Sequence, residues 1–385
     1  MAIAILGAGY AGVTVARRLE NNLPDDVDLV VVDESTDHLI RHELHRVLRR
    51  PSFEEDLTVP LADLFDRAEV RQGRVLEVVP EDHTVELEDG PLEYDYAAVC
   101  LGAETTFYEL PGVEDYAIPF RDLEHAHAIR DRYLDLLVDG GRVVVGGAGL
   151  TGIQVAGELA TLADEEDGRQ AVEIVLVEQL DDVAPGFPQN FRAAIRDELI
   201  ERGIDIRSET TVQGAREETI DLDDGELAYD LFIWTGGIGG SSALGGTRPQ
   251  VRGTLQLDRE TFVVGDAARV IDRDGELVPA SAQSAIREAR TAARNIQRLV
   301  EYDRDGDVFE PRLDTIDFDP RGWVVSVGDG AVAQVGPTIL RGAPALAVKA
   351  TAGVGYLSSV GAVREAIEVA REEFSGAMPA RTDRP

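Results

Sequence analysis

Two stretches of the chain place three glycines at one spacing, G-x-G-x-x-G, and this pattern can hold a phosphate. They read GAGYAG, from residue 7, and GAGLTG, from residue 147. The first glycine permits a tight turn, the second lets the backbone approach a pyrophosphate, and the third lets a helix pack closely on the preceding strand. The N–H groups at the start of that helix then bind the phosphates. The glycines of the two motifs are Gly7, Gly9, Gly12, Gly147, Gly149 and Gly152.

An acidic residue stands at the end of the second strand of each unit. Asp33 follows VDLVVV and Glu178 follows VEIVLV. A carboxylate at this position accepts hydrogen bonds from ribose hydroxyls and repels a 2′-phosphate, so Glu178 predicts NADH rather than NADPH. A single glycine motif is often only a closely packed helix start, but two complete units with both acids predict two bound dinucleotides. Tyr10 and Thr151, inside the turns, are candidates to line the cofactors.

These motifs need strands and helices that repeat along the chain. Apolar runs predict a strand, a helix and a second strand over 2–33, and the same order returns over 142–178. Each unit closes on a similar strand, YDYAAVCLG, which ends at Gly102, and YDLFIWTGG, which ends at Gly236 and Gly237. The alternation of strands and helices predicts an α/β fold with two Rossmann-like dinucleotide-binding domains, each on a mainly parallel sheet.

Several segments lie outside this core pattern. HELHRVLRR predicts a helix that ends at Pro51, GIDIRSETTV predicts one strand, and LPGVEDYAIPF, with two prolines, is typical of a connection between domains. Residues 280–300 predict a long helix with Ser281 as its N-cap. WVVSVG and AVAQVGP predict a small antiparallel pair, followed by a last helix over 358–374. The domain boundaries that follow are 1–110 with 251–318, then 111–250, then 319–385 as a small C-terminal α+β domain.

The charge balance is strongly acidic, with 37 Lys and Arg against 73 Asp and Glu and a net charge of −36. This charge argues against nucleic acid as a partner. Lys349 is the only lysine. A composition with so few lysines and so many carboxylates resembles that of proteins from salt-accumulating archaea, where molar salt screens self-repulsion. The chain has no apolar run of about 18 residues, and Met1 leads directly into the first strand, so we expect a cytoplasmic protein.

Cysteine and histidine add no further site. Cys100 is the only cysteine and lies in an apolar run, so it is predicted to be a core residue. A single cysteine cannot form an intrachain disulfide. The six histidines do not form a convincing ligand set, and no metal is expected.

Over residues 1–320 the chain resembles the flavoproteins of the pyridine nucleotide-disulfide oxidoreductase superfamily. The resemblance implies that the first glycine motif binds FAD and the second binds NADH. It also implies that the FAD domain resumes after the inserted unit at FVVGD, where Gly265 and Asp266 bind FAD, and that Arg41 approaches the flavin.

Within that superfamily the chain is most similar to type II NADH:quinone oxidoreductases. The similar stretches are HLIRHELHRVL, YDYAAVCLGAETTFYELPGVEDYAIPFRDLEHA, GGAGLTGIQVAGELA, WTGGI and ASAQSAIREARTAARNI. The resemblance implies hydride transfer from NADH to FAD and electron transfer onward to a quinone. Disulfide reductases and sulfide:quinone reductases of the superfamily use paired cysteines, which Cys100 alone cannot supply.

Three residues are candidates for catalysis at the acceptor on this resemblance: Gln154, Gln283 and Arg287. The related enzymes have a glutamate, a candidate proton relay, where this chain has Gln154, and an amide cannot titrate. Their motif A-Q-x-A-x-Q keeps its first glutamine here as Gln283, whereas the second is Arg287. These departures leave the acceptor open.

Two other functions therefore stand beside quinone reduction. One is a soluble NADH-dependent reductase of a ferredoxin or rubredoxin. The other is an NADH-binding redox sensor with little turnover, similar to apoptosis-inducing factor. The apolar segment 331–363 is a candidate for peripheral contact with the cytoplasmic face of a membrane, or for a homodimer contact.

Overall fold

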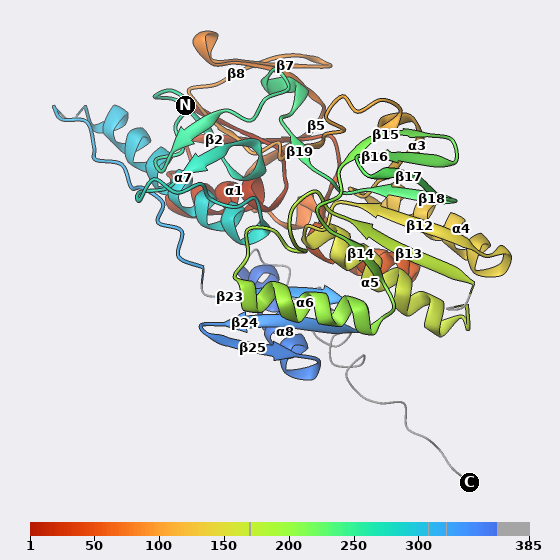
Figure 1. Ribbon diagram of the computed structural model, residues 1–385. Helices are drawn as coiled ribbons and strands as arrows, with labels where there is room; N and C mark the ends of the chain where they lie inside the picture. The colour runs from red at the N-terminus through yellow and green to blue at the C-terminus, as the bar shows by residue number, and fades with distance from the viewer. Residues whose placement is uncertain (169–170, 307, 321, 360–385) are drawn as a thin grey trace.

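The computed structural model describes residues 1–168, 171–306, 308–320 and 322–359. Two five-stranded parallel sheets dominate these residues, and a small antiparallel sheet with its helix follows near the C-terminus (Figure 1). The mixed α/β architecture agrees with the predicted fold class.

The first sheet has the strand order β21-β9-β1-β2-β5, and every pair in it is parallel. Its central strand, β1, pairs along both edges, Ala4 with Val30 on one side and with Ala97 on the other. It is buried on both faces, since the successive residues 3–6, whose side chains alternate between the faces, are all buried. This explains why the strand is a continuous apolar run rather than an alternating one. The strands are β1 (Ala2–Leu6), β2 (Asp28–Asp33), β5 (Glu69–Gln72), β9 (Tyr96–Val99) and β21 (Thr261–Val263), and α1 (Tyr10–Asn22) packs against α7 (Ala282–Asp305).

The second sheet repeats this plan with the order β11-β18-β12-β13-β14. Val144 of its central strand pairs with Val175 and Phe232, as Ala4 does with its neighbours in the first sheet. The strands are β11 (Ile118–Pro119), β12 (Gly141–Gly146), β13 (Val172–Val177), β14 (Asp205–Arg207) and β18 (Leu231–Trp234), and the helices are α4 (Leu123–Asp139), α5 (Leu150–Glu165) and α6 (Gln189–Glu201).

A three-stranded antiparallel sheet accompanies each parallel sheet, so the internal repeat extends beyond the glycine motifs. These are β6 (Val75–Val79), β7 (Thr84–Leu87) and β8 (Gly90–Glu93), and β15 (Val212–Arg216), β16 (Thr219–Leu222) and β17 (Gly225–Ala228). The smaller elements are β3 (Asp37–Leu39), β4 (Thr58–Pro60), β10 (Glu104–Thr105), β19 (Ile238–Gly239), β20 (Gln250–Arg252), β22 (Arg269–Ile271), α2 (Glu54–Leu57) and α3 (Val113–Tyr116).

Some local predictions differ from the structure. The single strand expected in GIDIRSETTV is two, β14 and β15, because the chain bends at Glu209, which has a φ of 54°. The connection LPGVEDYAIPF contains α3 and β11, and β11 is an edge strand, where a proline is tolerated. The predicted helix in HELHRVLRR is a 3₁₀ helix, η1 (Arg41–Leu48).

The C-terminal unit consists of β23 (Gly322–Val327), β24 (Gly330–Val335), β25 (Thr338–Arg341) and α8 (Ala343–Ser359). The expected antiparallel pair is present as β23 and β24, and β25 extends it. The small sheet packs against both α6 and α8 (Figure 1). The predicted helix over 358–374 overlaps only the end of α8, and residues 360–374 lie outside the described residues.

Helix α8 itself was not predicted, because its small apolar residues show no helical period. Within 331–363, the strand residues Ala331, Val332 and Ala333 are completely buried. Their apolar character therefore belongs to the core and not to a membrane surface. No helix in the described part of the chain is both long and apolar enough to cross a membrane.

Candidate functional site

The first glycine turn joins β1 to α1, and its glycines differ in their surroundings. Gly7 has a φ of 94°, and a Cβ there would lie 2.5 Å from the carbonyl oxygen of Cys100. A Cβ on Gly12 would lie 1.8 Å from the carbonyl oxygen of Gly7. Gly9 has an ordinary φ of −73°, and a Cβ there would meet no atom of the described residues within 4 Å. The protein itself therefore requires glycine at 7 and 12 but not at 9.

The second glycine turn repeats this arrangement. Gly147 has a φ of 98°, with Gly236 against its backbone, and a Cβ on Gly152 would lie 2.0 Å from the carbonyl oxygen of Gly147. Gly149 has a φ of −66° and, like Gly9, open space at its Cβ among the described residues. A glycine without a conformational or packing reason, at the same place in both turns, indicates a ligand that approaches the backbone there.

The two predicted acids lie against these turns. Asp33 Oδ2 accepts the N–H of Ala8 at 2.6 Å, and Glu178 Oε2 accepts the N–H of Ala148 at 2.8 Å. The second oxygen of each carboxylate accepts another backbone N–H, two residues further along. Burial raises the pKa of Asp33, and the bond from Ala8 opposes this effect. Each carboxylate is thus held rigidly beside its turn, with oxygen lone pairs left for further donors.

Helices α1 and α5 begin in a way that suits an anion. Their N-caps are Gly9 and Gly149, no side chain of the described residues caps either helix, and neither carries an acidic residue in its first turn. By contrast, Asp122 and Ser281 cap α4 and α7 with their side chains. The first two helices therefore present N–H groups and a partial positive charge to an outside partner.

The Gly265–Asp266 turn lies between α1 and α7. Gly265 has a φ of 72°, and a Cβ there would lie 3.2 Å from Ala285 on α7 and 3.4 Å from Ala11 on α1. Its N–H donates to Glu288 Oε2 at 2.7 Å. Sequence reasoning missed Glu288, although a charged residue on the apolar face of α7 was a usable signal.

Glu288 predicts a pH effect on stability. Burial raises its pKa to about 7 in the folded protein, from an ordinary value of 4.5. The folded state then binds the proton more tightly than the unfolded chain, so the free energy of unfolding falls as pH rises from about 4.5 to 7. Glu288→Gln still accepts the Gly265 N–H. Its free energy of unfolding is expected to exceed that of the wild type by about 2–3 kcal/mol at pH 8 and by almost nothing at pH 4.5. Denaturant unfolding in molar KCl at several pH values measures this, and a pH-independent difference would contradict it.

The other cofactor candidates lie around the two turns. Burial raises the pKa of both Asp33 and Asp266, and the positive charge of Arg41 opposes this rise at each acid. Gly102 follows β9 with a φ of 70°. A Cβ on Gly237 would lie 2.1 Å from the hydroxyl oxygen of Tyr108, so a side chain there would displace this exposed ring.

For three further candidates, the structure gives a position at a turn but no contact that requires a cofactor. Thr151 is exposed at the start of α5, and Tyr10, at the start of α1, is half-buried. Gly236 lies against the second turn, because a Cβ on Gly147 would lie 2.8 Å from its Cα atom. A Cβ on Gly236 itself would lie 2.5 Å from the Trp234 ring. Within the described residues, no group of three or more His, Cys, Asp or Glu side chains could hold a metal ion.

The structure does not join the three catalytic candidates into one hydrogen-bonded group. Gln154 is half-buried on α5, and Gln283 is half-buried at the start of α7. Arg287 donates to the carbonyl oxygen of Asp319 at 2.6 Å and lies over the Phe318 ring. Arg287 thus fastens the segment that leads to the C-terminal unit, and its role at the acceptor stays a prediction.

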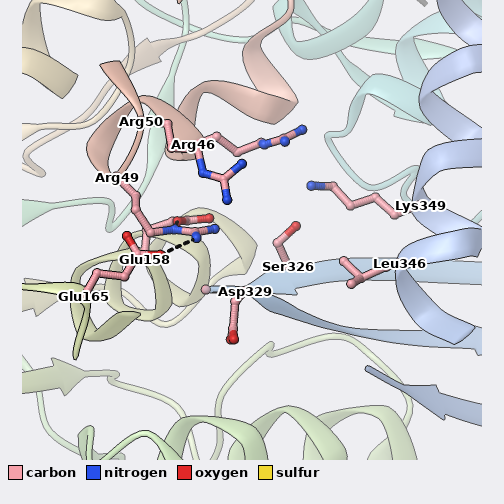
Figure 2. Close-up of a pocket in the computed structure, with 10 residues that line it drawn as sticks. Arg46, Arg49, Arg50, Glu158, Glu165, Ser326, Asp329, Leu346 and Lys349 are labelled. Carbon is pink, nitrogen blue, oxygen red and sulfur yellow. Dashed lines mark hydrogen bonds and ion pairs between the residues drawn. The ribbon is translucent and has the colours of Figure 1, made fainter. Parts of the chain in front are cut away.

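A polar cavity of about 190 Å³ lies where η1, α5, β23 and α8 meet (Figure 2). Arg49 binds Glu158 at 2.7 Å and Glu165 at 3.0 Å on one wall. On another wall, Lys349 lines the cavity and forms an ion pair at 2.7 Å with Glu43, which does not itself line it. Its lining residues are Arg46, Arg49, Arg50, Glu158, Glu165, Ser326, Gly328, Asp329, Leu346 and Lys349.

Two of the acids at this cavity are buried, whereas Glu165 and Asp329 are exposed at its rim. Glu43 and Glu158 are each 1% exposed. Burial alone would raise the pKa of Glu43, but the charge of Lys349 and of neighbouring basic groups lowers it well below its usual range. Burial raises the pKa of Glu158, against the effect of Arg49, and lowers that of His45. Sequence reasoning missed this cluster, whose only signal was the single lysine.

Helix α8 reaches from the cavity to the first glycine turn. The rings of Tyr356 and Tyr10 are 4.9 Å apart, edge to face. The Tyr356 hydroxyl lies 3.0 Å from His38 Nε2, and His38 Nδ1 lies 2.8 Å from the carbonyl oxygen of Ala8. Burial lowers the pKa of His38 to about 4, so this histidine is neutral near pH 7. The C-terminal unit therefore helps to build the wall of the first site.

Comparison with known proteins agrees with this geometry. A family model described as pyridine nucleotide-disulphide oxidoreductase matches residues 1–289. A type II NADH:quinone oxidoreductase of Haemophilus influenzae is 26% identical over 395 residues, which cover 85% of each chain. The demethylphylloquinone reductase NdbB of a Synechocystis species is 28% identical over 323 residues, covering 76% of this chain and 78% of the relative.

A similar fold is found among solved structures. NDH2 from Plasmodium falciparum, in complex with NADH, matches with a TM-score of 0.84 and 16% identity, covering 98% of this chain and 99% of the other. Sulfide:quinone oxidoreductase from Aquifex aeolicus matches with a TM-score of 0.80 and 18% identity, covering 97% and 94%. These matches extend over the C-terminal unit as well as both parallel sheets.

Proposed function

Because the chain belongs to the pyridine nucleotide-disulphide oxidoreductase family, we propose that it is an FAD-dependent NADH dehydrogenase that passes electrons to a quinone. The observation that carries the proposal is the pair Gly9 and Gly149, which have open space where a side chain would be. The relatives in Haemophilus influenzae and Synechocystis, both named as quinone reductases, support the choice of acceptor.

The residues around the first turn fit FAD. The start of α1 and the open face at Gly9 receive the pyrophosphate, and Asp33 receives the ribose of the adenosine half. Arg41 and Asp266 continue the site beyond the turn, and Glu288 holds the Asp266 turn through the Gly265 N–H. FAD, when bound here, supplies the hydride acceptor and the electron donor of the reaction.

The second turn fits NADH in the same way. Gly149 and the start of α5 receive its pyrophosphate, and Glu178 receives the adenosine ribose. The Thr235 hydroxyl oxygen lies 3.0 and 2.9 Å from the carbonyl oxygens of Gly146 and Gly147, so it steadies the turn. The residues thereby bind and orient NADH, and the protein contributes geometry rather than a reacting group.

Glu178 is expected to set the preference for NADH. A 2′-phosphate would meet its buried carboxylate, so wild-type flavin reduction should favour NADH over NADPH by about 100-fold. Glu178→Gln keeps the shape and removes the charge, and should narrow this ratio by about tenfold. Stopped-flow flavin reduction with both nucleotides measures it. Glu173→Gln, an exposed acid on the same strand, is the matched control, and an equal change there would contradict the prediction.

The proposal includes peripheral contact with a membrane through α8. The helix exposes Ala343, Pro344 and Ala347 and carries Lys349 as its only charged residue. Co-sedimentation with lipid vesicles in molar KCl tests the contact, and gel filtration in the same buffer tests the alternative, a homodimer. Binding that persists after Ala343→Glu and Ala347→Glu together would contradict a role for this face.

The function is tested by purifying the protein in molar KCl and following NADH oxidation with a short-chain quinone and with a ferredoxin. We expect a yellow protein that turns over with the quinone. Turnover with the ferredoxin alone would favour the soluble reductase. Flavin reduction by NADH without turnover on either acceptor would favour the redox sensor, and a colourless folded protein would exclude all three.

A further inference from the structure

The two glycine turns are alike except in what holds one of their carbonyl groups. Ala8 and Ala148 occupy the same place in them, and each donates its N–H to the acid at the end of the neighbouring strand. The carbonyl oxygen of Ala148 accepts the backbone N–H of Ala184 at 2.8 Å. The carbonyl oxygen of Ala8 instead lies 2.8 Å from Nδ1 of the His38 ring. The first turn therefore depends on a side chain where the second depends on the main chain.

The hydrogen bonds of His38 fix which of its nitrogens carries the proton. His38, on β3, is 1% exposed, and burial lowers its pKa to about 4, so the ring is neutral near pH 7. A carbonyl oxygen can only accept, so the proton of the neutral ring is on Nδ1 and points to Ala8. Nε2 is then an acceptor, and the Tyr356 hydroxyl, 3.0 Å away, donates its proton to it. The hydrogen bonds therefore run from Tyr356 through His38 to the turn.

The carbonyl group of Ala8 sets the direction of the next N–H group. The C=O of Ala8 and the N–H of Gly9 belong to one planar trans peptide unit, in which they point to opposite sides. Because His38 holds the carbonyl, the Gly9 N–H points away from that ring. It makes no hydrogen bond with any of the described residues, among which Gly9 also has open space at its Cβ. This N–H is therefore available to a ligand at the turn.

Tyr356 makes the C-terminal unit part of this arrangement. It is 7% exposed on α8, and its ring packs edge to face on that of Tyr10. The His38 ring packs on Tyr10 in the same way, with 5.4 Å between the ring centroids. The Tyr356 hydroxyl reaches His38 only while α8 is docked beside the first turn. At the second turn the partner is Ala184, which lies between β13 and α6 of the same unit.

Resting on the proposed function, we propose that His38 is a positioning residue for FAD: it directs the Gly9 N–H to the pyrophosphate, and Tyr356 keeps its ring in place. Binding of FAD and docking of α8 are then coupled, because both depend on the same orientation of His38. Such a coupling is reciprocal, so bound FAD should stabilise the docked α8, and the docked α8 should strengthen FAD binding. Binding of NADH at the second turn should not be coupled in this way.

Two substitutions of His38 test its bond to the turn. Asparagine places an N–H donor close to the position of Nδ1, whereas glutamine places its amide near Nε2 and leaves Ala8 without a donor. Because Ala8 is 2% exposed, His38→Gln should lower the affinity of the apoprotein for FAD by about tenfold or more. His38→Asn should stay within about threefold of the wild type. Flavin fluorescence during titration of the full-length apoprotein with FAD in molar KCl measures both, and equal losses in the two variants would refute the positioning role.

Tyr356→Phe tests the coupling to α8, because it keeps the ring and removes only the donor to His38. We expect FAD affinity to fall by about fivefold. Bound FAD should slow hydrogen exchange of the α8 amides in the wild type, and should slow it less in this variant. Tyr229→Phe is the matched control, since Tyr229 is also 7% exposed and donates to the carbonyl oxygen of Arg216 in the second unit. The control should change neither quantity, and equal slowing by FAD in Tyr356→Phe and the wild type would exclude the coupling.

The proton position on His38 is a readout that needs no turnover. The ¹⁵N NMR signals of His38 near pH 7 should be those of a neutral imidazole with its proton on Nδ1. Tyr356→Phe should shift the Nε2 signal, since that nitrogen loses its donor. A proton on Nε2 in the wild type would contradict the polarity on which the proposal depends.

The second turn serves as a control within the same molecule. At saturating FAD, the NADH concentration for half-maximal flavin reduction should change by less than about twofold in His38→Gln, because Ala184 still holds the second turn. A loss of NADH affinity as large as the loss of FAD affinity would show that His38 does not act on the first turn alone. A wild-type apoprotein that binds no FAD would overturn the proposed function, whereas FAD binding that none of these variants alters would overturn only the role of His38.

Discussion

Gly9→Val is expected to give a folded protein that purifies without the yellow colour of a bound flavin. A valine is compatible with the φ of −73° at this position, and no atom of the described residues lies within 4 Å of its Cβ. The side chain would instead fill the space that a pyrophosphate needs. We expect FAD affinity to fall by at least about 100-fold, since both the close approach and the helix N–H bonds are lost.

Gly149→Val is the matched change in the second turn. It should leave the flavin bound and the protein yellow, while lowering the affinity for NADH by a similar factor. The flavin absorbance of the purified proteins and the NADH concentration dependence of flavin reduction measure the two effects. If Gly9→Val kept its flavin, or if Gly149→Val lost it, the assignment of one dinucleotide to each turn would be wrong.

Lys349→Met is expected to cost about 3 kcal/mol of the free energy of unfolding. Glu43 is 1% exposed, and the substitution removes the ammonium that lies 2.7 Å from its carboxylate. The buried negative charge would then lack its main positive partner, which destabilises the folded state. Arg46, at 3.5 Å, remains and limits the loss. Denaturant unfolding in molar KCl measures the effect.

The double variant Glu43→Leu with Lys349→Met tests the cause. Because it removes both charges, it should recover most of the lost stability, as apolar replacements of buried ion pairs often do. The control is Arg142→Met, which breaks an exposed pair with Glu173 and should cost less than about 1 kcal/mol. A double variant as unstable as Lys349→Met alone would show that the loss comes from packing and not from charge.

The sequence by itself determined the two dinucleotide-binding units, because their signals are local. The glycine turns, the buried central strands and the acids at the ends of the neighbouring strands each depend on residues within about 35 positions of one another. Backbone conformation and strand burial restrict residue type at such positions directly, so the motifs at Gly7 and Gly147 predict the same turn twice. The alternation of strands and helices then decides the fold class.

The tertiary structure alone distinguished glycines that share a motif. Gly12 is required by contact with the Gly7 carbonyl, whereas Gly9 is open, and no sequence pattern separates packing from ligand approach. It also decided the surroundings of Glu288 on α7, whose partner is the backbone N–H of Gly265 in the turn after β21.

The cluster around Lys349 was beyond the sequence for the same reason. Lys349 and Glu43 are 306 positions apart and meet only because α8 packs over η1, and Tyr10 and His42 meet across two elements. A single charged residue carries no periodicity, and an ion pair depends on where two helices are placed rather than on either local sequence. Local conformation is specified by neighbours in the chain, whereas the electrostatics of a buried site are specified by neighbours in space.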